Sequence, residues 1–217
     1  MNTFGNITLI QGDCMDFMRT QADKAFDLAI IDPPYGSGNN ATVPHRENRV
    51  NGGDHKIYNT GTDIRKWDVP PTEAYFNELF RVTKNQIIWG GNYFGLPPTR
   101  CFVVWRKLSI SERFSMAMCE YAWTNFNGNA KWIEIAPQGN KEKRFHPTQK
   151  PIKLYTWLLN HYAKEGYRIL DTHLGSGSSA IAAYKLGFEF TGIEIDIDYY
   201  NKATQRIENE IKQLKIF

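Results

Sequence analysis

The sequence has few cysteines and no long hydrophobic run. Its three cysteines, Cys14, Cys101 and Cys119, lie far apart, which fits neither a disulfide framework nor a zinc site built from paired cysteines. No apolar stretch approaches the roughly 18–20 residues that span a bilayer. The opening residues, MNTFGNITLIQGD, lack the basic start and the apolar core of a signal peptide. We therefore expect a protein of the reducing cytoplasm.

Strong charge of either sign is also absent. The 217 residues include 26 Lys and Arg against 23 Asp and Glu, for a formal net charge of +3. A hydrophobic fraction of 41% is typical of a globular chain and excludes a disordered or fibrous one. The length suits one domain with its own core, and we expect residues 1–217 to form it. The weak positive charge permits a polyanionic partner without indicating one.

Short apolar runs alternate with helical patterns at both ends of the chain. Strands are expected at residues 7–10, 26–31, 86–89, 101–105, 116–124, 168–171 and 190–195, and helices at 72–81, 152–163, 179–186 and from 198 onward. This alternation predicts an α/β fold, an open, mostly parallel, doubly wound sheet of the Rossmann type with helices on both faces. Two polar, turn-rich segments, 39–66 and 125–147, are expected to be small irregular insertions.

A glycine-rich loop, DTHLGSGSSA at residues 171–180, follows a short strand in the last third of the chain. Gly175 and Gly177 permit a tight turn and a close approach of the backbone to a nucleotide-like ligand, so a side chain at Gly177 would fill the ligand's space. Glu194 ends the next strand, where its carboxylate can accept both ribose hydroxyls. The same pattern is typical of dinucleotide sites, and a plain turn with a solvated Glu194 is the other alternative. The loop indicates an adenosine-bearing ligand and leaves its identity open.

A second loop, DPPY at residues 32–35, follows a strand that reads as buried. Pro33 and Pro34 carry no backbone N–H, and an ionised Asp32 only accepts, so the loop offers several acceptors and few donors. Such a cradle suits an NH2 group, for example the exocyclic amine of adenine or cytosine, and Tyr35 offers a ring on which a base can stack. The alternative is a rigid turn without a ligand. Because ligands bind beyond the carboxyl ends of parallel strands, we expect both loops to face one cleft.

Several motifs together resemble a known family. DPPY, HPTQKP at residues 146–151 and the late glycine loop, with QGDCMDFM, NQIIWGGNYF, CFVVWRK and FTGIEIDIDYY, resemble the S-adenosylmethionine-dependent DNA amino-methyltransferases of the β-type motif order, above all small phage and prophage members. The resemblance covers nearly the whole chain. It implies the class I methyltransferase fold with permuted motif order, S-adenosylmethionine as cofactor, double-stranded DNA as substrate, and a bacterial or phage-infected bacterial cell. A homodimer and a cognate restriction nuclease stay open.

The resemblance also assigns roles to individual residues. Asp32, Pro33, Pro34 and Tyr35 would hold the target base, and the cofactor would contact Asp13, Lys150, Asp171, Gly175, Ser176, Gly177, Ser178 and Glu194. In that scheme Asp13 lies near the adenine ring and Lys150 near the methionine carboxylate. One departure is visible, because the family usually has Asp-Pro-Phe where this chain has Asp171, Thr172 and His173. We interpret His173 as a structural histidine rather than a base, and we expect no metal site.

Basic residues in the two polar segments are the expected phosphate contacts. They comprise Arg46, Arg49 and Lys56, with His45 and His55 beside them, and Lys141, Lys143 and Arg144, with Lys153 just beyond. A solvated basic face is the alternative for each of them. A base inside a duplex cannot reach such a cleft, so we expect the target nucleotide to flip out and stack on Tyr35.

The target base and the reaction class both have rivals. Within the family, Asp at the first position of DPPY favours adenine N6, because Ser is commoner there in the cytosine N4 enzymes. Cytosine N4 is the alternative target. The other readings are an oxidoreductase that binds a dinucleotide through LGSGSSA, a methyltransferase of RNA or of protein glutamine, and a binding module without catalysis. The sequence favours a site-specific DNA methyltransferase acting on adenine.

Overall fold

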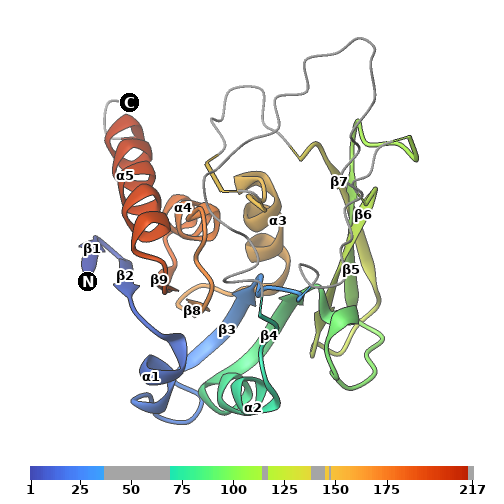
Figure 1. Cartoon of the computed structure of the whole chain (residues 1–217), viewed down its shortest axis with the longest axis horizontal. Helices are drawn as coiled ribbons and strands as arrows, with labels where there is room; N and C mark the ends of the chain where they lie inside the picture. Colours follow the sequence, from blue (N-terminus) through green and yellow to red (C-terminus); the bar gives the residue numbers. More distant parts are fainter. Residues whose placement is uncertain (37–68, 114–116, 138–144, 147, 215–217) are drawn as a thin grey trace, which may run out of the picture.

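The computed structural model describes residues 1–36, 69–113, 117–137, 145–146 and 148–214, and a nine-stranded sheet runs through them (Figure 1). The strands are β1 (Asn2–Phe4), β2 (Ile7–Gln11), β3 (Phe26–Ile31), β4 (Thr83–Trp89), β5 (Phe102–Lys107), β6 (Cys119–Thr124), β7 (Lys131–Ile135), β8 (Arg168–Asp171) and β9 (Glu189–Glu194). The helices are α1 (Cys14–Arg19), α2 (Glu73–Val82), α3 (Ile152–Tyr162), α4 (Ser178–Leu186) and α5 (Ile197–Leu214), with a 3-10 turn η3 (Gly91–Tyr93).

The sheet is mostly parallel, as the sequence predicts. Its strand order is β1-β2-β9-β8-β3-β4-β6-β5-β7. The five strands β2, β9, β8, β3 and β4 pair in parallel, whereas β6 runs antiparallel to both β4 and β5, and β1 runs antiparallel to β2. The edge strand β7 is parallel to β5. The carboxyl ends of β2, β9, β8, β3 and β4 therefore point to one edge of the sheet, where loops can assemble a site.

Helices cover both faces of the sheet. Along β3, Leu28 and Ile30 join a core that includes α3, α4 and α5, whereas Ala29 and Ile31 join a second core with α1 and α2. Successive residues of a strand point to opposite faces, which explains why this strand is apolar throughout. Figure 1 shows α3, α4 and α5 on one side of β3 and β4, and α1 and α2 on the other. The predicted doubly wound α/β sheet is confirmed.

Local sequence signals account for several helix ends. Thr72 is the N-cap of α2, although its side chain makes no capping hydrogen bond. Gly187 ends α4 in the left-handed conformation, with φ of 77°, and its N–H donates hydrogen bonds to carbonyl oxygens of that helix.

The helix α5 packs on the sheet through one face. Ala203, Ile207 and Ile211 are buried at a spacing of four residues, which places them on that face.

Three elements were not expected from the sequence. β7 lies inside the segment 125–147, so the prediction of irregular structure is wrong for Lys131–Ile135. This short edge strand forms by pairing with β5, a partner that its own sequence does not reveal. α1 lies between the strands expected at residues 7–10 and 26–31, where no helix was predicted, and β1 precedes the first predicted strand. Both are too short for a hydrophobic period to develop. None of the helices in the described ranges combines the length and the apolarity needed to cross a bilayer.

Candidate active site

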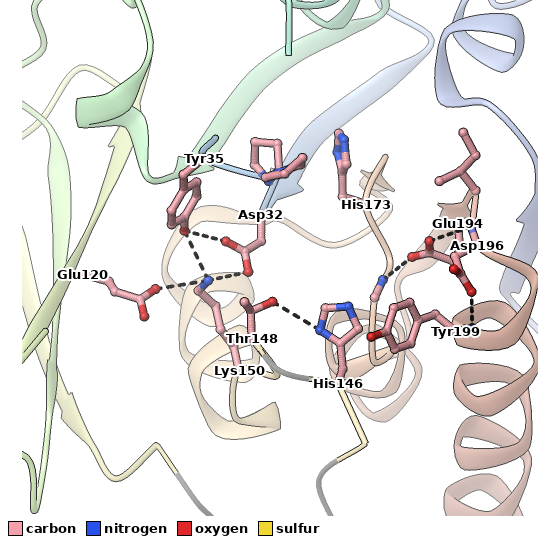
Figure 2. A pocket seen from close by; sticks show the side chains of 14 residues that line it. Asp32, Tyr35, Glu120, His146, Thr148, Lys150, His173, Glu194, Asp196 and Tyr199 are labelled. Atoms are coloured by element: carbon pink, nitrogen blue, oxygen red, sulfur yellow. Dashed lines mark hydrogen bonds and ion pairs between the residues drawn. The ribbon is translucent and has the colours of Figure 1, made fainter. Parts of the chain in front are cut away.

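A pocket opens at the carboxyl edge of the sheet, where β3, β8 and β9 end. One wall is the loop after β3, with Asp32, Pro33, Pro34 and Tyr35, and the opposite wall contains Gly175 and Glu194 (Figure 2). The acceptor-rich loop and the glycine-rich loop thus line one cavity. Their shared position follows from the parallel pairing of β3 with β8 and of β8 with β9.

The Asp32 carboxylate accepts from two side chains. The Tyr35 hydroxyl donates to Oδ1 at 2.7 Å, and the Lys150 ammonium forms an ion pair with Oδ2. Burial raises the pKa of Tyr35 well above its usual value, which keeps the hydroxyl protonated as a donor. Burial also raises the pKa of Asp32, and the positive charge of Lys150 opposes that shift. Each oxygen of this carboxylate therefore already has one partner.

Lys150 belongs to a chain of buried and half-buried charges that reaches β5 and β6. Its Nζ lies 3.1 Å from Glu120 Oε2, and Glu120 Oε1 lies 2.6 Å from Lys107 Nζ. Only 4% of the Lys150 side chain and 8% of the Lys107 side chain are exposed, so both ammonium groups depend on these carboxylates for compensation. Burial alone would lower the pKa of Lys150, but Asp32 and Glu120 outweigh it and raise that pKa. Burial likewise opposes ionisation of Glu120, and the charges of Lys150 and Lys107 prevail and lower its pKa.

Two tyrosines from different loops stack beside this network. The rings of Tyr35 and Tyr93 have centroids 5.0 Å apart and planes 20° apart, and Tyr93 is 61% exposed. The tight turn after β4 makes the stack possible, because Gly90 has φ of 67° and a Cβ there would overlap the Tyr35 ring. The sequence did not single out Tyr93, although it lies within the GGNYF stretch.

The carboxylate of Glu194 is held by backbone donors at the other end of the pocket. Oε2 accepts from Gly175 N at 2.8 Å, and Oε1 accepts from Asp196 N at 3.0 Å. Burial raises the pKa of this carboxyl group, and the two N–H donors oppose the shift. A carboxylate has about four acceptor positions. Glu194 can therefore accept further hydrogen bonds from a molecule in the pocket.

Asp171 stabilises the glycine-rich loop from behind the pocket wall. Its Oδ1 accepts from His173 N at 3.0 Å, and its Oδ2 accepts from Ser179 Oγ at 2.5 Å. Burial raises the pKa of Asp171 to about 7. Asp171 is 2% exposed and does not line the cavity, and its hydrogen bonds to His173 and Ser179 fix the glycine-rich loop.

Gly177 faces a neighbouring helix. It has φ of 76°, and a Cβ there would lie 2.9 Å from Ile207 Cδ1 and 3.4 Å from Ala203 Cβ, both in α5. A Cβ at Gly177 would therefore contact α5, and the expectation that a side chain there would fill the ligand's space stays a prediction. Ser176 and Ser178 are buried beside it and do not line the pocket.

Two residues assigned to the cofactor have protein partners in the structure, and their assignment stays a prediction. Asp13 is the N-cap of α1, where its side chain accepts from Met15 N at 2.7 Å, and it does not line the pocket. The Lys150 ammonium contacts Asp32 and Glu120, at the end of the pocket assigned to the base. The candidate phosphate contacts Arg46, Arg49, Lys56, Lys141, Lys143 and Arg144, together with His45 and His55, lie outside the described residues.

Two half-buried histidines line the pocket between its ends. His146 packs edge-on against Tyr199 at 4.4 Å, and its Nδ1 lies 3.2 Å from Thr148 Oγ1. His173 Nδ1 lies 3.0 Å from Thr172 Oγ1. Burial lowers the pKa of each histidine to about 4, so both rings are neutral near pH 7. The HPTQKP motif contains His146, but only the fold places it in the pocket. Across the described residues, no cluster of three His, Cys, Asp or Glu side chains could hold a metal ion.

Comparisons with known proteins agree with this architecture. The model of the N6/N4 DNA methylase family matches residues 87–205. The protein YubD of Escherichia coli (strain K12), a methylase by name, is 25% identical over 91% of this chain and 88% of its own. The type II methyltransferase M2.MboI of Moraxella bovis is 22% identical over 96% of this chain and 92% of its own.

Solved structures show the same fold. The M1.HpyAVI–SAM complex superposes with a TM-score of 0.57 at 18% identity and covers 92% of this chain and 99% of that one. The cytosine-N4-specific PvuII DNA methyltransferase gives a TM-score of 0.58 at 11% identity, over 97% and 96% of the two chains. Because the family model matches more than half of the sequence, this chain belongs to the N6/N4 DNA methylase family and is a DNA amino-methyltransferase of adenine N6 or cytosine N4.

Proposed function

We propose that this enzyme transfers a methyl group from S-adenosylmethionine to N6 of an adenine flipped out of double-stranded DNA. The observation that carries the proposal is the shared pocket, which joins the acceptor-rich loop at Asp32 to the glycine-rich loop at Gly175. A methyl donor and an amine can meet in such a cavity only if both loops face it. The substrate and the cofactor would then be brought together by positioning, which is a large part of catalysis for two bound reactants.

The residues at the Glu194 end fit an adenosine-bearing cofactor. Glu194 is held by two backbone N–H groups and retains acceptor positions for ribose hydroxyls. Gly175 lines the pocket without a side chain, which lets its backbone approach a ligand. When bound, S-adenosylmethionine supplies an electrophilic methyl group on a sulfonium. One of the similar structures is a complex with SAM, which supports the assignment.

At the other end, Asp32 and the prolines would orient the target amine. The lone pair of an exocyclic amine is delocalised into the base, so the amine is a poor nucleophile. Hydrogen bonds from NH2 to Asp32 and to the Pro33 carbonyl would favour a tetrahedral nitrogen and localise that lone pair. The nitrogen gains positive charge as it gains the methyl group, and the carboxylate stabilises this charge. One proton then leaves the nitrogen, to Asp32 or to water, and restores a neutral amine.

The aromatic wall of the pocket would receive the flipped base. Flipping costs a few kcal/mol, and stacking on an aromatic side chain contributes about 1–3 kcal/mol per base. Tyr35 lies directly beside Asp32, so a base stacked on its ring would present its amine to the carboxylate. Tyr93 extends the same aromatic surface toward solvent.

Adenine is favoured over cytosine by the first residue of the DPPY loop. Within the family, Asp at that position is more typical of adenine enzymes. Cytosine N4 is the second candidate, since the PvuII enzyme with a similar fold is cytosine-N4-specific. Both bases present an exocyclic NH2 to the same acceptors, so the reaction chemistry is common to the two candidates.

Methylome sequencing tests the proposal directly. DNA from a host without its own methyltransferases, expressing this protein, is expected to carry N6-methyladenine in one short sequence context. N4-methylcytosine would instead support the second candidate. In parallel, tritiated S-adenosylmethionine should label unmethylated duplex DNA but not RNA or protein. Absence of N6-methyladenine from this DNA would overturn the proposal.

A further inference from the structure

Each oxygen of the Asp32 carboxylate already has one partner in the structure, and one of these two partners carries a full positive charge. Tyr35 donates to Oδ1, and the Lys150 ammonium pairs with Oδ2. A target amine that approaches the same carboxylate must compete with a full positive charge. The nitrogen of that amine also becomes positive during the reaction, and two like charges at one carboxylate repel each other.

Glu120 lies on the far side of the same ammonium. Figure 2 shows the Lys150 nitrogen between the carboxylates of Asp32 and Glu120, and its distance to Glu120 Oε2 is 3.1 Å. We propose that Glu120 is a positioning residue that draws the Lys150 ammonium away from Asp32 when the target amine binds, and so frees Oδ2 to accept from the amine. The inference rests on the proposed function and deepens it, because it concerns how the same site admits its substrate.

The surroundings of Glu120 suit this role. Lys107 Nζ holds Glu120 Oε1 at 2.6 Å, which fixes the carboxylate on β6 while its other oxygen faces Lys150. An ammonium group has three hydrogens and needs only a small movement to strengthen one contact at the expense of another. The ring centroids of Trp89 and Tyr35 lie 5.4 Å and 6.0 Å from Lys150 Nζ, so favourable aromatic surfaces also surround this charge.

The charge balance of the cluster explains why a second carboxylate is required. Two ammonium groups and two carboxylates form the buried chain from Lys107 through Glu120 and Lys150 to Asp32. Without Glu120, Asp32 would be the only carboxylate in contact with Lys150 among the described residues. The ammonium would then remain on Asp32, because leaving it would strand a buried charge. The target amine would be excluded, although the cofactor end of the pocket would be unchanged.

The test compares three variants with the wild-type protein. Glu120→Gln keeps the size of the side chain and removes its charge, and we expect kcat to fall about 10- to 100-fold while the dissociation constant of S-adenosylmethionine stays within twofold. Adding Lys150→Met removes the competitor, so the double variant should recover at least threefold in kcat over Glu120→Gln. The control is Glu134→Gln, which removes the partner of Arg106 at the neighbouring edge strand and should leave kcat within twofold.

The recovery distinguishes an active role from a merely structural one. A residue that only stabilised the fold would give a double variant no better than Glu120→Gln, and that result would overturn the inference. Wild-type kcat in Glu120→Gln would overturn it as well. If Glu120→Gln does not fold, Glu120→Asp retains the charge and should lose less than tenfold, and a larger loss in a folded protein would refute the idea. Failure of the proposed function is separate, since the wild-type protein would then methylate no DNA.

Discussion

The two ends of the pocket hold their carboxylates by different means. Glu194 is bonded by the backbone N–H groups of Gly175 and Asp196, on the loops that meet at its strand end. Asp32 is bonded by the side chains of Tyr35 and Lys150. Backbone donors are fixed by the conformation of their loops, whereas a lysine side chain has four rotatable bonds and can exchange partners.

This difference separates the tasks of the two ends. A ligand that must be bound in one orientation is bound best by fixed protein groups, since these groups lose little conformational freedom when it binds. A substrate that enters and leaves at each turnover is bound better by a carboxylate whose side-chain partner, such as Lys150, can move away. We therefore expect substitutions at the Glu194 end to change cofactor affinity and substitutions at the Asp32 end to change turnover.

The largest expected effect comes from Asp32→Asn. The amide keeps the shape of the side chain but replaces one acceptor oxygen with an NH2 donor, and it removes the negative charge beside the reacting nitrogen. We expect kcat to fall about 10³-fold or more, in the range of lost electrostatic and proton-accepting groups. Calorimetric titration should find S-adenosylmethionine binding within threefold of the wild type. Turnover near the wild-type rate would show that Asp32 does not hold the amine.

The two ends also differ in how far the sequence predicts them. The strands Phe26–Ile31 and Arg168–Asp171 are predicted to the residue, because each is a short apolar run between turn formers. The position of Glu194 at the end of β9 follows from the same local signals. The loop after β8 carries Gly175 and β9 ends at Glu194, so local pattern places these two residues at the cofactor end of the pocket.

The network around Asp32 could not be predicted in this way. Glu120 comes from β6 and Lys107 from the end of β5, strands that pair antiparallel outside the parallel part of the sheet. No periodicity or turn signal in either strand marks a charge that will be buried against Lys150. Only the order of the strands brings these side chains together, and strand order depends on long-range pairing.

His173→Phe tests the pH response of the pocket between its two ends. Burial lowers the pKa of His173 to about 4. Below the unfolded pKa of about 6.5, the unfolded chain binds a proton that the folded chain does not, so stability falls as the pH drops from 6.5 toward 4. This histidine should account for about 2 kcal/mol of lost stability between pH 7 and pH 5. In urea unfolding, the free energy of unfolding of His173→Phe should fall by about 2 kcal/mol less between pH 7 and pH 5 than that of the wild type. An equal fall in both proteins would show that His173 is protonated in the folded state at pH 5.

Glu194→Gln tests whether the cofactor end acts through fixed acceptors. One oxygen becomes an NH2 group that faces a backbone N–H, either of Gly175 or of Asp196. Hydrogen bonds to charged groups are worth about 1.5–3 kcal/mol, so the dissociation constant of S-adenosylmethionine should rise about 10- to 100-fold. Turnover at saturating cofactor should stay within threefold. Glu189→Gln, at the other end of β9 where it pairs with Arg168 on the surface, is the matched control and should change neither quantity.

The smallest effects distinguish the two glycines of the loop. Gly175 and Gly177 have φ of 52° and 76°, so alanine at either position costs about 1–2 kcal/mol of backbone strain. At Gly177 the new Cβ would press on Ile207 in α5 at 2.9 Å, whereas at Gly175 it would lie at an ordinary 3.5 Å from the His146 ring in the pocket. Gly177→Ala should therefore be the less stable variant, by about 1 kcal/mol or 2–4 °C in Tm. Gly175→Ala should be the variant that loses several-fold in cofactor affinity. The opposite pattern, with weakened cofactor binding and an unchanged Tm in Gly177→Ala, would indicate that Gly177 contacts the cofactor.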